Sequence, residues 1–284
     1  MKDLRDRVAV ITGAASGIGR SLAECAAQEG MKVVLADIQE QALARTEADL
    51  TANGAAALSV VTDVSKATAI EALAQKTLDA FGAVHLLCNN AGVGTASTIW
   101  EASIADWDWH IKVNLYGVIH GIRTFVPIML RQDTECHILN TSSITGIVSY
   151  PGLGVYQVTK HGIVALSEAL YLELTLCEAK IGVSVLCPGL VDTKIWDCER
   201  NRPEDLAARS AGAALAADAQ ARTEGMRRAM ASAMPPEQVA ESAFEGIKAG
   251  RFYILTHPDE NYLVKARMES ILQGGTPPLP GFGL

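Results

Sequence analysis

Short runs rich in β-branched residues alternate with helical patterns almost from the first residue of the chain. This alternation is typical of a parallel sheet covered by helices, because the connection between two parallel strands usually contains a helix. The pattern predicts seven strands, at Val8–Thr12, Lys32–Asp37, Ala57–Thr62, Val84–Cys88, His137–Asn140, Val183–Cys187 and Phe252–Leu255. We therefore expect an α/β fold.

Helical patterns lie between these strands and help to set the domain limits. They begin near Ile18 and cover Gln39–Leu50, Ala67–Phe81, Asp106–Leu130, Tyr156–Ala179 and a segment from Pro235 to Gly246 or Gly250. At roughly 150 residues per domain, 284 residues allow one large domain or two small ones. We expect a single domain over residues 1–256, with an alanine-rich and charged substrate lid at 194–234. The segment 257–284 is expected to be a tail without regular structure, because it ends rich in Gly and Pro.

Charge and cysteine usage exclude several classes of protein. The net charge is −8, and no dense run of Lys and Arg is present, so nucleic acid is not an expected partner. The six cysteines lie far apart without a C-x-x-C pair, which predicts reduced thiols in a cytoplasmic protein. His120, Arg123 and Pro127 interrupt the longest apolar helical stretch, Val113–Leu130, so no membrane span is expected. The histidines lack ligand spacing, and no metal is expected.

A glycine-rich turn joins the first strand to the first helix. Its sequence is Thr12-Gly13-Ala14-Ala15-Ser16-Gly17-Ile18-Gly19. The unpaired N–H groups and the dipole of a helix N-terminus favour an anion, and glycine lets the backbone approach it closely. The turn therefore predicts a pyrophosphate site at Gly13, Ser16, Gly17, Ile18 and Gly19. A generic tight turn is the alternative.

Acidic residues end the second and third predicted strands at the same edge of the sheet. Asp37 can accept hydrogen bonds from both ribose hydroxyls of an adenosine and would repel a 2′-phosphate, so its position favours NAD over NADP. An ordinary polar strand end is the alternative, and Arg20 or Arg45 would weaken the preference. Ile38 follows at the same edge, and Asp63 and Val64 are placed for an adenine contact.

The reactive groups are predicted at the start of the longest helix. Tyr156 and Lys160 are one turn apart and share a face, so the ammonium is expected to lower the pKa of the phenol. That would suit Tyr156 for acid–base work. Thirteen residues upstream of Tyr156, Ser143 ends the fifth strand and can donate a hydrogen bond to a substrate oxygen, with Ser142 as the competitor.

Taken together, these motifs resemble the short-chain dehydrogenase/reductases. The resemblance rests on T-G-A-A-S-G-I-G, N-N-A-G at 89–92, V-N-L at 113–115, Ser143, Tyr156-x-x-x-Lys160 and P-G-L-V-D-T at 188–193, and it covers roughly residues 6–255. It implies a single Rossmann-like, doubly wound domain with about seven parallel strands. It also implies that Ser143 orients the substrate oxygen, that Tyr156 is the acid or base, and that Lys160 also holds the nicotinamide ribose.

The resemblance assigns further residues to supporting roles. Asn114 would interrupt helical bonding and support a proton relay to Lys160. The cofactor would also contact Asn90, Ala91, Gly92, Pro188, Gly189, Val191 and Thr193.

The chain ends differently from most relatives, with R-F-Y-I-L-T-H-P at 251–258 in place of a V-D-G-G strand. A similar ending occurs in relatives that oxidise bulky hydrophobic alcohols. An apolar pocket is therefore expected from Ile144, Tyr150, Leu153, Leu190 and Trp196, although each could equally belong to the core.

The expected function is hydride transfer between NAD(H) and a hydrophobic secondary alcohol or ketone. An NADPH-dependent carbonyl reductase is the nearest alternative, and a non-catalytic dinucleotide sensor is the alternative from another class. The helices at 106–130 and 156–179 are expected to pack in a homodimer or homotetramer.

Overall fold

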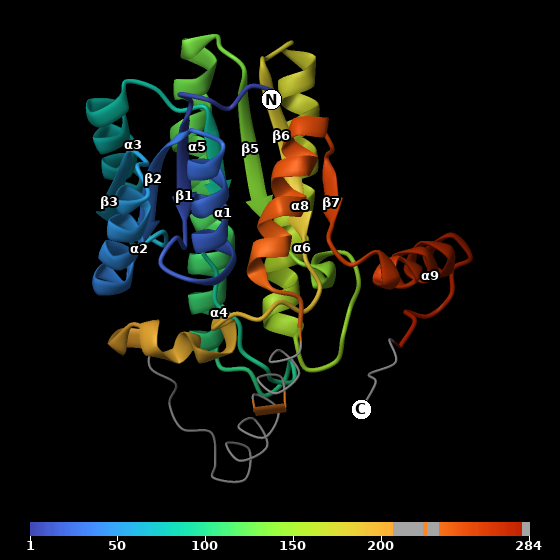
Figure 1. Ribbon diagram of the computed structural model, residues 1–284. Helices are drawn as coiled ribbons and strands as arrows, with labels where there is room; N and C mark the ends of the chain where they lie inside the picture. Colours follow the sequence, from blue (N-terminus) through green and yellow to red (C-terminus); the bar gives the residue numbers. More distant parts are fainter. Residues whose placement is uncertain (207–223, 226–232, 280–284) are drawn as a thin grey trace.

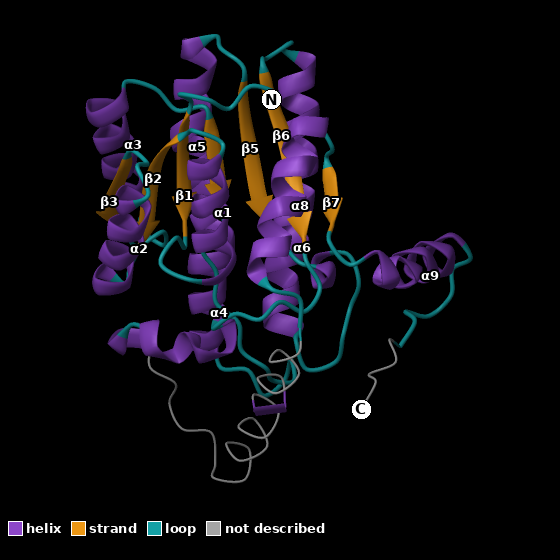
Figure 2. Cartoon of the chain, viewed as in Figure 1, coloured by secondary structure: helices purple, strands orange, loops and turns teal. Residues whose placement is uncertain are grey.

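The computed structural model describes residues 1–206, 224–225 and 233–279. One sheet carries seven parallel strands in the order β3-β2-β1-β4-β5-β6-β7, which confirms the predicted fold class (Figure 2). Its strands are β1 (Val8–Thr12), β2 (Lys32–Asp37), β3 (Ala57–Val61), β4 (Leu86–Asn89), β5 (Cys136–Thr141), β6 (Ile181–Cys187) and β7 (Tyr253–Leu255). The predicted positions hold to within two residues at each strand end.

The order of the strands creates a crevice at the centre of the sheet. Strand β1 pairs with β2 on one side, where Val10 faces Val34, and with β4 on the other, where Val10 faces Leu87. The chain therefore leaves β1 and β4 in opposite directions. In open parallel sheets such a switch point is where ligands bind, at the carboxyl ends of the strands.

Helices cover both faces of the sheet. Alternation along β1 separates two cores: Ala9 and Ile11 face one core, whereas Val8 and Val10 face the other. Figure 1 shows α1 and α8 side by side in front of the sheet, with α5 and α6 behind it. The front layer comprises α1 (Gly17–Gln28), α2 (Glu40–Ala52) and α8 (Pro236–Ala249), and the back layer α3 (Ala67–Phe81), α5 (Gly117–Gln132) and α6 (Gly154–Leu176).

The helix expected over Asp106–Leu130 is not one regular α-helix. It consists of α4 (Ile104–His110), a π-helical turn (Ile111–Tyr116) and α5. Such a turn lets one residue leave the regular hydrogen-bond ladder, and Asn114 lies within it. Within the described ranges, Ile104–Gln132 is the one helical run that is long and apolar enough to span a membrane. In this fold it packs on α3, β4 and α6.

The tail differs from its prediction. Residues Asn261–Leu272 form a helix, α9, which lies beyond β7 in Figure 1. The expectation was wrong because Gly and Pro are concentrated after Gln273, whereas the twelve residues of α9 contain neither. Leu263 of α9 packs on Ile144 and Val148, next to the crevice. Most of the expected lid and the last five residues lie outside the described residues.

The six cysteines are all free thiols, as expected. Cys88, Cys136, Cys187 and Cys198 are buried, whereas Cys177 is exposed.

Candidate active site

A cavity of about 1220 Å³ lies at the carboxyl ends of the strands. Every cofactor and substrate candidate named from the sequence lines it, together with Ser143, Tyr156 and Lys160. Asn114, the remaining catalytic candidate, does not line the cavity, because its side chain is fully buried behind the cavity wall. The fold therefore brings residues from the ends of six strands to one site, as a ligand crevice requires.

The glycine-rich turn forms a cradle that side chains would fill. Gly13 and Gly17 have φ values of +70° and +52°, which favour glycine. A Cβ on Gly13 would lie 2.9 Å from Ala91 Cα, and a Cβ on Gly19 would overlap the carbonyl oxygen of Gly13. Ser16 precedes α1, and its side chain does not cap the helix. The backbone thus provides an uncovered helix N-terminus that suits a pyrophosphate.

The carboxylate of Asp37 connects the glycine-rich turn to the residues that follow β2. Its Oδ2 accepts a hydrogen bond from the N–H of Ala15 (3.1 Å), and its Oδ1 accepts one from the N–H of Gln39 (2.9 Å). Each carboxylate oxygen keeps a free lone pair for a ribose hydroxyl. Arg20 does not compete, because its guanidinium donates to Glu24 (2.8 Å) and Asp49 (2.9 Å).

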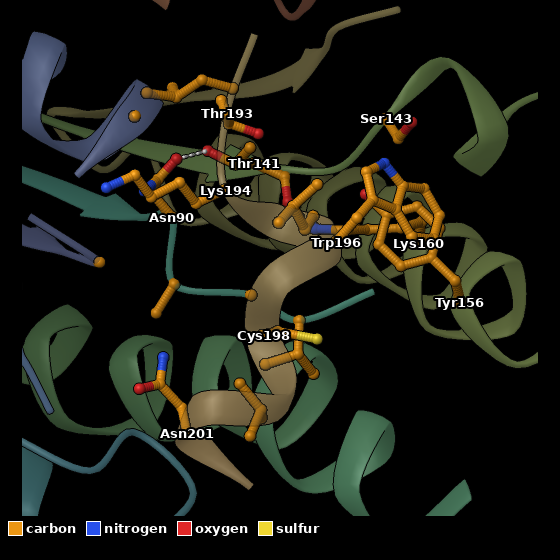
Figure 3. Close-up of a pocket in the computed structure, with 18 of the residues that line it drawn as sticks. Asn90, Thr141, Ser143, Tyr156, Lys160, Thr193, Lys194, Trp196, Cys198 and Asn201 are labelled. Atoms are coloured by element: carbon orange, nitrogen blue, oxygen red, sulfur yellow. Dashed lines mark hydrogen bonds between the residues drawn. The ribbon is translucent and has the colours of Figure 1, made fainter. Parts of the chain in front are cut away.

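Asn90 links the carboxyl ends of three strands by hydrogen bonds. Its side-chain Nδ2 donates to the carbonyl oxygen of Thr12 (3.0 Å), and its Oδ1 accepts from Thr141 Oγ1 (3.2 Å; Figure 3). The backbone N–H groups of Asn90 and Ala91 donate to Thr12 Oγ1 at 2.9 and 3.1 Å. These bonds fix β1, β4 and β5 relative to one another.

Ser143, Tyr156 and Lys160 meet at the other end of the cavity. Tyr156 and Lys160 lie in the first turns of α6, with Lys160 Nζ 5.4 Å from the centre of the Tyr156 ring. Ser143 Oγ donates to the carbonyl oxygen of Pro188 (3.3 Å). The neighbouring Ser142 donates instead to the backbone carbonyl of Lys160 (2.8 Å), so its hydroxyl fixes α6.

The ionisable groups here are strongly affected by burial. Burial lowers the pKa of Lys160 to about 8. Burial raises the pKa of Tyr156 well above its ordinary value, although a hydrogen bond with Ser143 acts in the opposite direction. The lowering of the Tyr156 pKa that was expected from Lys160 is therefore not found in the protein alone. The ammonium donates to the carbonyl oxygen of Thr141 (2.9 Å) rather than to the phenol, which explains the difference.

Asn114 lies in the π-helical turn next to Lys160. Its Oδ1 accepts from the N–H of Val93 (2.8 Å), and its Nδ2 donates to Val93 O (3.0 Å) and Thr159 Oγ1 (3.1 Å). A Cβ on Gly92 would lie 3.4 Å from Asn114 Oδ1 and 3.6 Å from Lys160 Nζ. Both polar groups thus flank Gly92.

The expected substrate residues surround these reactive groups. Ile144, Leu153 and Trp196 are buried, whereas Leu190 is 43% exposed. The Trp196 ring centre is 6.4 Å from that of Tyr156. Trp196 belongs to the short helical segment Ile195–Asn201, which crosses the cavity in Figure 3. At its nucleotide end, Arg200 donates to Gln39 (3.3 Å).

Two residues of the cavity region were missed by the sequence analysis. His257 Nδ1 accepts from the N–H of Gly189 (3.1 Å), and its Nε2 bonds the carbonyl oxygen of Leu190 (3.1 Å). Glu260 lines the cavity. Both follow β7, where the sequence departs from the common ending, but that signal alone does not identify a side chain. Among the described residues, no group of three or more His, Cys, Asp or Glu could hold a metal.

Comparisons with known proteins agree with this geometry. The family model for short chain dehydrogenases matches residues 7–204. A dehydrogenase/reductase of CLA biosynthesis from Lactiplantibacillus plantarum is 36% identical, covering 98% of this chain and 97% of that protein. A C alpha-dehydrogenase from a Sphingobium strain is 31% identical over 98% of this chain and 89% of its own. A crystal structure of a short-chain dehydrogenase/reductase from Burkholderia phymatum in complex with NAD has a TM-score of 0.95 and 46% identity, covering 99% of this chain and 100% of that one.

Proposed function

Since the chain belongs to the short-chain dehydrogenase/reductase family, we propose that it is an NAD-dependent dehydrogenase acting on a hydrophobic secondary alcohol or ketone. The observation that carries this proposal is the meeting of Ser143, Tyr156 and Lys160 in the same cavity as the glycine cradle and Asp37. A dinucleotide that spans this cavity would have its adenosine at the Asp37 end, its pyrophosphate at the glycine cradle and its reactive ring near Tyr156. The apolar wall next to Tyr156 supports a hydrophobic substrate.

The residues present fit NAD. The cradle of Gly13, Gly17 and Gly19 leaves room for the pyrophosphate, and Asp37 offers free lone pairs to the adenosine ribose. When bound, NAD supplies the nicotinamide ring that takes up a hydride from the alcohol. The segment Pro188–Thr193 would hold the nicotinamide end, and Asp63 and Val64 the adenine.

The protein's own groups would handle the proton. Ser143 donates a hydrogen bond to the substrate oxygen, and Tyr156 as phenolate takes the hydroxyl proton while the C–H bond gives up its hydrogen with the electron pair. In the reverse direction, the phenol returns the proton to the carbonyl oxygen. Lys160 remains mostly protonated at neutral pH, with its pKa near 8, so that its charge favours the phenolate that burial disfavours. Asn114 is a positioning residue behind Lys160.

We further propose a cytoplasmic homodimer or homotetramer. The outer face of α6 leaves Tyr171, Leu172 and Leu176 between 44 and 86% exposed, which suits contact with a second copy. The six free thiols fit a reducing compartment. Sedimentation of the protein as 30.1 kDa particles alone would contradict the oligomer.

Replacing Tyr156 tests the catalytic assignment. Tyr156→Phe removes only the hydroxyl and should lower turnover of secondary alcohols by about 100-fold to 10,000-fold, because the acid–base step is lost. Binding of NAD, measured by titration calorimetry, should change little. Tyr171→Phe is the matched control, since it removes a hydroxyl from the exposed face of the same helix.

Two outcomes would contradict the proposal. Near-normal turnover of Tyr156→Phe would remove Tyr156 from the reaction. Tight binding of NAD by the unaltered protein, without turnover of any alcohol in a broad hydrophobic panel, would instead favour a dinucleotide sensor.

A further inference from the structure

His257 follows β7 and bonds two successive backbone groups of the segment that follows β6. Its Nδ1 accepts from the N–H of Gly189 (3.1 Å), and its Nε2 lies 3.1 Å from the carbonyl oxygen of Leu190. Because a backbone N–H can only donate, Nδ1 carries no hydrogen, and the hydrogen of the neutral ring is on Nε2, where it donates to Leu190. Thr256 Oγ1, 2.8 Å from Nδ1, is then a second donor to that nitrogen.

The peptide between Pro188 and Gly189 is held at both of its polar ends. Its carbonyl oxygen, on Pro188, accepts from Ser143 Oγ (3.3 Å) and from the N–H of Ile144 (2.8 Å). Its N–H, on Gly189, donates to His257. Since a peptide group is planar, a rotation that breaks the bond at one end also moves the other end. Ser143 and His257 therefore bond opposite ends of one rigid unit.

Gly189 lets the imidazole approach this peptide closely. A Cβ at position 189 would lie 2.8 Å from His257 Cγ and 2.7 Å from Glu260 Oε2, so even alanine would displace side chains there. His257 does not itself line the active-site cavity, whereas Gly189 and Leu190 do. Any influence of the imidazole on the reaction therefore passes through this backbone.

The role proposed for Ser143 makes support of this peptide necessary. A hydroxyl has one hydrogen, so when Ser143 donates to the substrate oxygen, its bond to Pro188 is broken. The peptide then keeps the bond from Ile144 at its carbonyl end and the bond to His257 at its N–H end. Without the imidazole, one bonded end would remain, and the peptide would be free to rotate about it.

We propose that His257 is a positioning residue for the reaction. It holds the backbone from Pro188 to Leu190 in place while Ser143 turns to the substrate oxygen, and the same backbone would hold the nicotinamide end of NAD. The proposal rests on the proposed function. It adds a side chain that lies outside the cavity and outside the motifs of the family resemblance, whereas the chemical step stays with Tyr156 and the cofactor.

Two substitutions separate the hydrogen bonds of His257 from its bulk. His257→Gln keeps an acceptor and a donor on one planar group and should retain kcat to within about 3-fold. His257→Met fills similar space without either bond and should lower kcat by about 10-fold or more, because two hydrogen bonds are lost and each is worth roughly 2-fold to 10-fold. His120→Met is the control, since His120 lies outside the active-site cavity, and it should leave kcat unchanged.

Counting binding sites distinguishes positioning from a general effect on folding. Calorimetric titration with NAD gives the number of binding sites and the dissociation constant, and kcat is then expressed per site. The affinity for NAD should change by less than about 3-fold in both variants, because Asp37 and the glycine cradle lie at the other end of the cavity. Fewer sites with an unchanged kcat per site would mean that His257 only stabilises the fold, which would overturn the proposal.

The imidazole nitrogens provide a measurement that does not depend on turnover. Nitrogen-15 NMR distinguishes a ring nitrogen that carries a hydrogen from one that does not, and His257→Gln identifies the His257 signals by their loss from those of the six histidines. At pH 8, Nε2 should carry a hydrogen and Nδ1 should carry none. A hydrogen on Nδ1 would overturn the proposal, because Gly189 would then have no acceptor on the ring.

The two proposals fail in different ways. Absence of turnover with every alcohol, despite NAD binding by the unaltered protein, overturns the proposed function and with it the positioning role. Turnover by the unaltered protein, with a near-normal kcat in His257→Met, overturns the positioning role alone. An equal loss of kcat in His257→Gln and His257→Met also overturns it, because the hydrogen bonds would then not be what the reaction requires.

Discussion

At the nucleotide end of the cavity, backbone groups at strand ends set the positions, whereas at the substrate end side chains from distant segments do so. Thr12, Asn90 and Asp37 bond mainly to backbone groups that the parallel register already places. At the substrate end, Arg202 reaches Asp106, and His257 reaches Gly189. The sequence separation is large at both ends, 78 residues between Asn90 and Thr12 against 96 and 68 residues here, but only the bonds at the nucleotide end join the ends of strands that pair in the sheet.

Because the two ends of the cavity are positioned in different ways, the residues that would bind the cofactor are distinct from those that would select the substrate. The nucleotide end depends on strand register and glycine geometry, so few substitutions there are neutral. The substrate end depends on a small number of side chains that follow β6 and β7, and single substitutions can change its shape without disturbing the sheet. Specificity in such a molecule can change independently of the chemistry.

The largest change in cofactor preference is expected from Asp37 at the nucleotide end. Asp37→Ala removes acceptors for the ribose hydroxyls and the negative charge that opposes a 2′-phosphate. The ratio of kcat/KM for NADP to that for NAD should rise by about 100-fold, since one hydrogen bond to a charged group alone is worth about 10-fold to 100-fold. Steady-state kinetics with both cofactors measures this ratio.

Asp79→Ala is the matched control for Asp37, because it removes an exposed carboxylate that is bonded to Gln75 outside the cavity. A clear preference of the unaltered protein for NADP would contradict the role given to Asp37. The NADPH-dependent carbonyl reductase would then be the better interpretation.

At Lys160, which lies beside Tyr156 at the substrate end, we expect a residue needed for turnover to lower the stability of the fold. Its pKa is 10.5 in the unfolded chain and about 8 in the fold, so the unfolded state binds more protons between these values. Burying its charge therefore costs about 3 kcal/mol below pH 8. Lys160→Met removes this cost but also the bond to Thr141, worth about 1 kcal/mol. Turnover should be lost.

Urea unfolding provides the measurement for Lys160→Met. At pH 7 the variant should be more stable by about 2 kcal/mol, which is roughly 30-fold in the folding equilibrium. The difference in unfolding free energy between the variant and the unaltered protein should shrink as the pH increases from 8 to 10.5, because the other groups that titrate in this range are common to both proteins. A variant that is less stable at pH 7 would show that Lys160 is not held under strain by burial.

The sequence predicts the nucleotide end better than the substrate end for a physical reason. Runs such as Val8–Thr12 are buried on both faces, and their apolar pattern is visible without any partner. The turn after β1 is equally local. His257 and Glu260, by contrast, gain their meaning only from contact with Gly189, about 70 residues away, which no local pattern contains. The predicted lowering of the Tyr156 pKa was wrong for a similar reason, because burial, which raises this pKa, depends on the whole fold.

The sequence analysis missed regular structure where the average composition of a segment concealed a local pattern. The tail looks irregular as a whole because of its last residues, yet Asn261–Leu272 is a helix. The helix expected over Asp106–Leu130 contains a π-helical turn, which brings Asn114 to the backbone of Val93. The family resemblance implied this interruption at Asn114, whereas the apolar pattern did not. Apolar periodicity cannot detect such a turn, since the residues on either side keep helical spacing.

The smallest of these effects is expected from Arg202, which anchors the substrate-side segment. Its side chain is 4% exposed, lies 4.5 Å from the centre of the Trp109 ring and forms ion pairs with Asp106 and Glu199. Although burial acts in the opposite direction, hydrogen bonds from Arg202 and Ser103 lower the pKa of Asp106. Arg202→Met removes the guanidinium from the Trp109 ring and leaves Asp106 with Ser103 but without its cationic partner, which loosens the segment that carries Trp196.

For Arg202→Met, KM for the alcohol should rise by about 10-fold, whereas the affinity for NAD should change by less than about 3-fold. The difference arises because Trp196 is on the segment that Arg202 anchors, but the glycine cradle and Asp37 are fixed by the sheet. Lys180→Met is the control, since it breaks an exposed ion pair with Asp133. An equal loss of alcohol and NAD binding, measured by kinetics and calorimetry, would mean that the two ends of the cavity are coupled through Ile195–Asn201, whose Arg200 contacts Gln39.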